Sequence, residues 1–193
     1  MEERKFPLQS VTKVIGLECV PSTQSVAEEL ACAGEQDGTL VLACGQTAAY
    51  GRDGRPFSAA EGGVYFTLIL RPNKSASGLG ALAEKAASAA AQTVSSVFDV
   101  KTKATADGDV LAWEPKKRKW KKLGGALAEI SCSADAVLLG VGIHLNNRLS
   151  ASARETSVSL KQLIGTETSK ELFLDELLEN FWKHYAHWLA SAR

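Results

Sequence analysis

Two apolar runs enclose a long glycine- and arginine-bearing segment between residues 39 and 66. The runs at residues 40–44 and 64–70 are rich in apolar, β-branched and aromatic residues, which favour strands with a buried face. The segment between them carries Arg52 and Arg55, whose planar guanidinium groups suit phosphate or carboxylate, among glycines that allow close backbone approach to a ligand. Structureless loops of about twenty residues are uncommon in compact domains. This segment is therefore either a functional loop or a mobile hairpin loop with solvated arginines.

The remaining periodic segments predict further strands and helices. Strands are expected at residues 11–20, 97–101, 109–113, 123–132 and 137–145, and helices at 25–34, 77–96, 159–164 and from a Thr168–Glu171 capping box to near the end. The run at 137–145 is continuous enough for a buried central strand. Together these elements predict an α+β fold, a mixed and mostly antiparallel sheet with helices over one sheet face.

Length and charge limit the classes of function. The 193 residues fit one domain, and 22 basic residues balance 22 acidic ones, so the molecule has no overall field that would attract nucleic acid or an acidic membrane. The basic run at 115–122 is expected at a solvated hairpin tip. Residues 1–13 do not resemble a signal peptide, and no apolar run approaches the roughly eighteen residues of a membrane span. We expect a cytoplasmic protein.

No metal site is expected from the cysteines or histidines. The four cysteines are scattered without metal-ligand spacing among apolar neighbours, which favours free, buried thiols. His184 and His187 lie three apart on the last predicted helix without a third ligand, which favours surface or packing roles. The cysteines are Cys19, Cys32, Cys44 and Cys132.

The loop resembles the signature of the biotin protein ligases. In that signature a strand ends with Gln-Thr, an arginine-glycine turn follows, and a Gly-Gly-aromatic segment begins the next strand. The matching residues here are Gln46-Thr47, Gly51-Arg52, Gly54-Arg55, Gly62-Gly63 and Tyr65. The resemblance extends over about residues 14–189 and implies the class II synthetase-like catalytic core of the biotin and lipoate ligases. It implies one catalytic domain over 1–193, without an N-terminal helix-turn-helix or a C-terminal small β-barrel.

The resemblance implies an ATP-dependent ligase that activates biotin as biotinyl-5'-adenylate and transfers it to a lysine of a biotin carboxyl carrier domain. Mg²⁺ would accompany the ATP, and the protein would be a monomer or homodimer. One alternative is a ligase or transferase of the same superfamily that acts on lipoate or octanoate. Another is a non-catalytic relative that binds a cofactor or carrier protein. Gln24 and Gln46 favour biotin, because they suit its polar ureido edge.

The resemblance also implies roles for individual residues. Lys122, directly before Leu-Gly-Gly-Ala-Leu-Ala-Glu, matches the lysine of the family's Lys-Leu-x-Gly-x-Leu-x-Glu strand, and Lys121 is taken as its solvated neighbour. Lys122 and Arg52 are the implied catalytic residues. A capped helix start at Ser22, Thr23 or Ser25 would also present backbone N–H groups to a ligand. The implied substrate-binding residues are Ser22, Thr23, Gln24, Gln46, Tyr50, Gly51, Arg52, Arg55, Asp109, Lys122, Gly124 and Gly125.

Three segments depart from the family pattern, all by analogy at the ligand site. Residues 49–55 read Ala-Tyr-Gly-Arg-Asp-Gly-Arg in place of Gly-Arg-Gly-Arg-x-Gly-Arg, so Tyr50 replaces an arginine that helps retain the adenylate. Residues 103–109 replace Lys-Trp-Pro-Asn-Asp, with two more residues and without the tryptophan and proline. His144 stands where the Gly-x-Gly-x-Asn strand usually carries asparagine.

Overall fold

The computed structural model describes residues 11–72, 78–132 and 135–191. Within these ranges the elements are β1 (Lys13–Val20), α1 (Thr23–Cys32), β2 (Thr39–Gln46), η1 (Arg52–Gly54), β3 (Val64–Leu70), α2 (Leu79–Phe98), β4 (Thr102–Ala104), β5 (Asp109–Glu114), β6 (Lys119–Ile130), β7 (Val137–Ile143), α3 (Ala153–Thr156), α4 (Leu160–Ile164) and α5 (Lys170–Ser191). The strands form one sheet in the order β1-β2-β3-β7-β6-β5-β4, parallel between β1 and β2 and antiparallel elsewhere. The predicted α+β class is confirmed.

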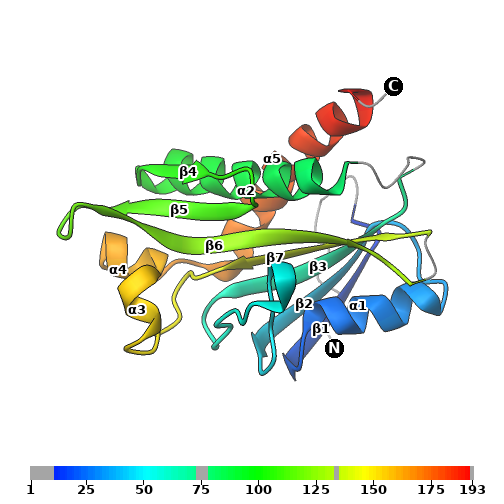
Figure 1. Cartoon of the computed structure of the whole chain (residues 1–193), viewed down its shortest axis with the longest axis horizontal. Helices are drawn as coiled ribbons and strands as arrows, with labels where there is room; N and C mark the ends of the chain where they lie inside the picture. Colours follow the sequence, from blue (N-terminus) through cyan, green and yellow to red (C-terminus); the bar gives the residue numbers. More distant parts are fainter. Residues whose placement is uncertain (1–10, 73–77, 133–134, 192–193) are drawn as a thin grey trace.

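Helices lie on both faces of the sheet (Figure 1). Successive residues of β2 point to opposite faces: Leu40 packs in the cluster under α2 and α5, whereas Val41 packs with Ala27 and Ala31 of α1. The prediction that helices cover one face is therefore wrong for α1. The parallel β1-α1-β2 connection places this helix across the sheet from α2, with its N-terminus at the end of β1.

The long helix α2 packs closely on the sheet through buried alanines, as its alanine-rich sequence predicts. It ends at Phe98, where Asp99 takes the left-handed conformation (φ 53°). The strand predicted at 97–101 is therefore wrong: its first two residues complete the helix. The next strand, β4, begins at Thr102, is only three residues long and is held by pairing with β5. A strand this short and polar carries no signal in its own sequence.

The hairpin between β5 and β6 turns earlier than the sequence predicts. Its exposed tip is residues 115–118, with Arg118 at φ 49°, and β6 begins at Lys119 instead of residue 123. Side chains alternate along β6, so Lys121 points inward and is only 3% exposed, with its Nζ 3.0 Å from Glu114 Oε2. The expectation that Lys121 is a solvated neighbour of Lys122 is wrong.

The central strand and the C-terminal helices follow the prediction with two changes. β7 is a buried strand between β3 and β6, as expected. α3 has no counterpart in the predicted elements, and α5 is capped by Ser169 instead of Thr168: Leu172 N–H donates to Ser169 Oγ at 3.2 Å. The backbone of Thr168 is instead held by the Asn146 side chain, through bonds of 2.9 and 2.7 Å. None of the described helices is long and apolar enough to cross a membrane.

Candidate functional site

The loop after β2 folds over the sheet beside the N-terminus of α1 and borders an open pocket of about 830 Å³, solvent at its mouth included. Of the twelve site residues that the sequence predicts, all except Gly124 line the pocket. A Cβ at Gly124 would collide with the Gly142 carbonyl oxygen, so this glycine permits close pairing of β6 with β7.

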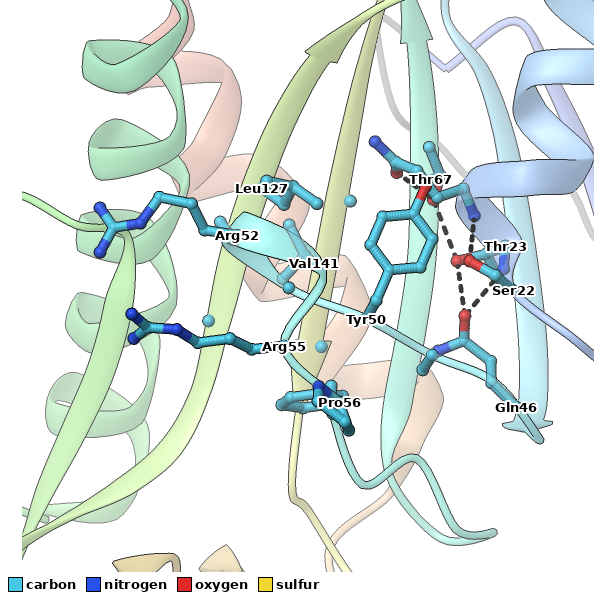
Figure 2. A pocket seen from close by; sticks show the side chains of 18 of the residues that line it. Ser22, Thr23, Gln46, Tyr50, Arg52, Arg55, Pro56, Thr67, Leu127 and Val141 are labelled. Atoms are coloured by element: carbon cyan, nitrogen blue, oxygen red, sulfur yellow. Dashed lines mark hydrogen bonds between the residues drawn. The ribbon is translucent and has the colours of Figure 1, made fainter.

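One end of the pocket is a corner of uncharged hydrogen-bonding side chains, drawn with dashed bonds in Figure 2. Ser22 is the N-cap of α1, with its Oγ accepting from Gln24 N–H at 3.2 Å. Gln46 Oε1, at the end of β2, accepts from Thr23 N–H at 2.7 Å and from the Thr23 hydroxyl at 3.2 Å. Thr67 of β3 lies 3.0 Å from Thr23 Oγ1 and 3.1 Å from Gln24 Oε1. The corner is thus pre-organised by its own bonds.

A partly buried carboxylate, that of Glu129, connects this corner to Tyr50. Gln24 Nε2 donates to Glu129 Oε2 at 2.9 Å and to the Leu138 carbonyl at 3.0 Å. The Tyr50 hydroxyl donates to the same Glu129 oxygen at 3.2 Å. Burial and the Glu129 charge raise the pKa of Tyr50 to about 12, so the phenol is neutral at pH 7. Tyr50, which stands in place of the family's arginine, is therefore a neutral donor to a carboxylate.

The other end of the pocket is charged. Lys122 Nζ lies 2.6 Å from Asp109 Oδ1, with the two side chains 36% and 40% exposed. Arg52 pairs with Asp107, and Figure 2 shows Arg52 and Arg55 together on the side of the pocket away from Thr67. Solvent-exposed ion pairs contribute only about 0–1 kcal/mol. These cations can therefore exchange a carboxylate for a phosphate at little cost.

The arginine loop is folded by regular hydrogen bonds. Gly51 N–H donates to the Arg55 carbonyl at 2.8 Å, and Phe57 N–H donates to the Ala49 carbonyl at 2.9 Å. Gln46 and Ala59 form a further bridge at the base of the loop. Asp53 takes a positive φ of 60° in the short turn η1 and lies 3.8 Å from both arginines. This geometry favours the functional loop over the mobile one.

Aromatic rings back the pocket behind Gly142. Phe57 lines the pocket and stacks on His144 with ring centroids 4.9 Å apart. His144 is only 2% exposed, and its Nδ1 accepts from the Asn147 amide at 3.0 Å. Burial, with a smaller effect of the Lys122 charge, lowers the pKa of His144 to about 4. This residue, which replaces the family's asparagine, is a neutral ring that acts on the pocket through Phe57.

Several pocket residues were missed at the sequence level. Thr67 had a readable signal, because it is the one polar residue in the apolar run of β3. Gly140 had a weaker signal, as a glycine that interrupts the apolar run at 137–145. In the structure a Cβ at this position would lie 2.7 Å from Gln24 Oε1, so the glycine leaves room for the glutamine. Asp107 and Phe57 lie in loops, where a charged or aromatic residue needs no particular partner.

The cysteines are exposed, so the prediction of buried thiols is wrong. Among the described residues, Glu28, Cys32 and Cys132 bring their side-chain ligand atoms within 4.8 Å of one another, away from the pocket. On α5, His184 lies 3.1 Å from Gln92 of α2, and His187 is exposed.

No protein-family model matches the chain. It is 31% identical over 175 residues to the bifunctional ligase/repressor BirA of Bacillus subtilis (strain 168), a match over 87% of this chain. The chain spans about half of that relative, 52% of its length. The biotin protein ligase of Aquifex aeolicus, solved with biotin and ATP, is similar in structure at a TM-score of 0.81 and 24% identity, over 94% of this chain and 73% of that one.

The chain is similar in sequence to the bifunctional ligase/repressor BirA and has the fold of the solved biotin protein ligases. A second solved member, the Leishmania major biotin protein ligase in complex with biotinyl-5-AMP, has a TM-score of 0.69 at 20% identity, over 93% of this chain and 76% of that one. The resemblance to biotin protein ligases is therefore confirmed. In this chain, the pocket lies between the N-terminus of α1 and the strands β5 and β6.

Proposed function

We propose that the chain is an ATP-dependent biotin protein ligase of the cytoplasm. One observation carries the proposal: a single pocket joins an uncharged hydrogen-bonding corner to a cationic end. Biotin has the matching polarity, with a ureido ring at one end and a carboxylate at the other. The corner of Ser22, Thr23, Gln24 and Gln46 would hold the ring, and the carboxylate would point toward Lys122 and Arg52.

The first step would join biotin to ATP. A carboxylate oxygen of biotin attacks the α-phosphorus, the bond to the β-phosphate bridging oxygen breaks, and pyrophosphate leaves with the electron pair. Negative charge increases on the α-phosphate oxygens in the transition state, where pre-organised cations stabilise it. Lys122 is suited to this role because its ammonium lies at the pocket wall as a compact charge. Arg52, with the backbone of Tyr50 and Gly51, would lie over the same phosphate.

The second step would transfer biotin to a lysine of a biotin carboxyl carrier domain. The neutral ε-amine attacks the acyl carbon of the adenylate, the bond to the phosphate oxygen breaks, and AMP leaves. An amide forms and the amine loses a proton. The pocket is open to solvent, which leaves an approach for an acceptor lysine.

Mg²⁺ would enter with the ATP. Two aspartates, Asp107 and Asp109, line the pocket, and each is ion-paired to a cation. Among the described residues, the one group of three metal-ligating side chains whose ligand atoms lie close together is Glu28, Cys32 and Cys132, which do not line the pocket. The nucleotide phosphates, with few protein ligands, are therefore the suitable holders of the ion. Mg²⁺ would supply charge neutralisation on those phosphates.

Calorimetric titration with biotin, alone and with Mg-ATP, followed by mass analysis for biotinyl-adenylate, tests the proposal. We expect biotin to bind and the adenylate to form. Binding of lipoate or octanoate without binding of biotin would reassign the substrate within the superfamily. Biotin binding without adenylate would indicate a non-catalytic relative.

A further inference from the structure

One row of α1 side chains reaches the end of β6 and the two residues that follow it. Gln24, Glu28 and Cys32 are spaced four residues apart, so they lie in a row along the helix. Gln24 bonds Glu129 on β6, and the two residues further along α1 face Ser131 and Cys132, just beyond the strand. This α1–β6 seam starts at the pocket and ends at a pair of cysteines.

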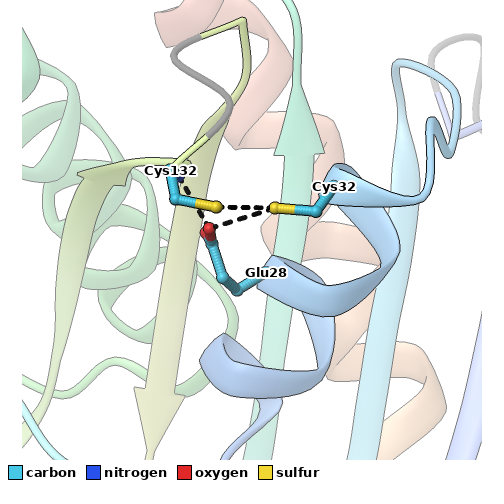
Figure 3. Close-up of side chains that lie close together, drawn as sticks. All are labelled: Glu28, Cys32 and Cys132. Carbon is cyan, nitrogen blue, oxygen red and sulfur yellow. Dashed lines mark hydrogen bonds between the residues drawn. The ribbon is translucent and has the colours of Figure 1, made fainter.

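Figure 3 shows that end of the seam. The Sγ atoms of Cys32 and Cys132 lie 2.7 Å apart, and both residues are exposed. Glu28 Oε1 accepts from Cys132 N–H at 2.7 Å and from the Ser131 hydroxyl at 3.3 Å, and it lies 3.5 Å from Cys32 Sγ. These bonds hold Cys132 in place opposite the helix. The two thiols are thus oriented toward each other by residues other than themselves.

The separation of the sulfurs distinguishes two chemistries. Two thiolates bound to one tetrahedral zinc ion at about 2.3 Å lie about 3.8 Å apart. The observed 2.7 Å is shorter than that spacing and shorter than ordinary non-bonded contact between heavy atoms. With the glutamate, the described residues supply three ligand atoms, whereas structural zinc sites usually have four. The geometry fits a covalent sulfur–sulfur bond better than a shared metal ion.

We propose that Cys32 and Cys132 form a reversible disulfide that links the C-terminal end of α1 to the end of β6. The two thiols lose two protons and two electrons to a peroxide such as hydrogen peroxide, which is reduced to two water molecules. A dithiol reductant reverses the step by thiol–disulfide exchange. The bond closes a loop of about one hundred residues.

The disulfide stabilises the seam without rearranging the pocket. The sulfurs are in contact before the bond forms, so α1 does not need to move to make it. Closing a loop of this size restricts the unfolded chain and raises Tm, by on the order of 5–10 °C for a chain of this length. Gln24 and Glu129, at the other end of the seam, keep their bond in both states. Biotin affinity is therefore expected to change less than twofold.

The test maps disulfides in the purified full chain. The protein is incubated with hydrogen peroxide or with dithiothreitol, remaining thiols are alkylated with iodoacetamide, and peptides are assigned by mass spectrometry. We expect a peptide pair joined through Cys32 and Cys132 after oxidation, which disappears on reduction. Cys19 and Cys44, exposed on β1 and β2, are internal controls, and both should be alkylated after either treatment. Thermal unfolding of the same samples gives the shift in Tm.

Matched variants separate the bond from general oxidation. Cys32→Ser and Cys132→Ser should each abolish the rise in Tm, whereas Cys19→Ser should retain it. The proposal is overturned if Cys32 and Cys132 are alkylated after oxidation as completely as Cys19, or if either pairs with another cysteine. It is also overturned if the reduced protein binds Zn²⁺ stoichiometrically and the metal protects both thiols from peroxide. None of these readouts depends on biotin or ATP.

Discussion

Lys122 Nζ lies 2.6 Å from Asp109 Oδ1 at the pocket wall, while its neighbour Lys121 is buried on the opposite face of β6 against Glu114. Two adjacent lysines in one basic run thus have separate environments. Lys122 shares its exposed position with a carboxylate that a phosphate can replace. Lys121 also donates to the Arg154 carbonyl and holds the region of α3 against the sheet.

Replacing Lys122 by alanine should stop adenylate formation and leave the fold intact. The loss of one pre-organised cation should lower the rate of pyrophosphate release about 10²–10³-fold. The Lys122 and Asp109 side chains are 36% and 40% exposed, so removing the lysine leaves no buried charge unpaired. A coupled pyrophosphate assay with biotin and Mg-ATP measures the rate, and circular dichroism follows the fold. Normal pyrophosphate release by folded Lys122→Ala protein would contradict the role.

Lys121→Ala is the matched control for that variant. It removes the closer of the two cations beside the partly buried Glu114, because Lys117 lies 3.9 Å from the same carboxylate, and it should destabilise the protein by about 1–3 kcal/mol. Below its lowered melting temperature, the variant should release pyrophosphate at the wild-type rate.

Restoring arginine at position 50 should slow the escape of the adenylate. Tyr50 is a neutral donor at the pocket wall, and a guanidinium there adds a charged donor for the phosphate. A hydrogen bond to a charged group contributes about 1.5–3 kcal/mol, which corresponds to a roughly 10- to 100-fold slower dissociation. Release of preformed biotinyl-adenylate into a chase of unlabelled biotin measures this rate. Tyr50→Phe is the control and should not slow it; unchanged dissociation in Tyr50→Arg would mean that the loop holds the phosphate differently.

Thr67→Val should weaken biotin binding as well as stability. The substitution keeps the shape of the buried side chain but removes the hydroxyl that bonds Thr23 and Gln24. The partners left behind should cost about 1–3 kcal/mol of unfolding free energy. Thr93→Val is the matched control, since this buried hydroxyl bonds Ala89 and Asn180 between α2 and α5. We expect both variants to melt earlier in urea and only Thr67→Val to bind biotin more weakly in calorimetry.

Stability should fall in mild acid because of His144. Its pKa is about 4 in the folded protein against about 6.5 when unfolded, so between these pH values the unfolded chain binds the proton more tightly. Stability is therefore fully present above pH 6.5 and decreases as the pH falls toward 4, by about 3 kcal/mol. Urea unfolding at pH 7 and pH 5 measures the difference.

His144→Asn, which carries a side chain that does not titrate, should reduce that pH dependence. Burial also lowers the pKa of His184, so His184→Gln is needed to measure its separate contribution. If His144→Asn protein kept the full acid sensitivity of the wild type, the buried imidazole would not be its source.

Local patterns in the sequence predicted much of this protein. Apolar runs predicted most strands, and helical spacing predicted the helix at 159–164 that is observed as α4, because both signals depend on neighbours within a few residues. The pocket loop was also readable, since Gln46, Gly51 and Arg52 lie within one segment whose spacing is itself the signal. Boundaries set by the ends of a helix or the turn of a hairpin were less accurate, as at Phe98 and Lys119.

Only the tertiary structure decided which distant residues meet. Gln24 and Glu129 are 105 residues apart, and Cys32 and Cys132 are 100 apart. Each pair forms because α1 packs on β2, β3 and β7 on one face of the sheet, which brings it to the end of β6. The inward position of Lys121 likewise depends on where β6 begins, since a shift of one residue would exchange it with Lys122. Local sequence determines which strands and turns form. Strand order and register, which depend on packing across the whole sheet, determine which side chains share a site.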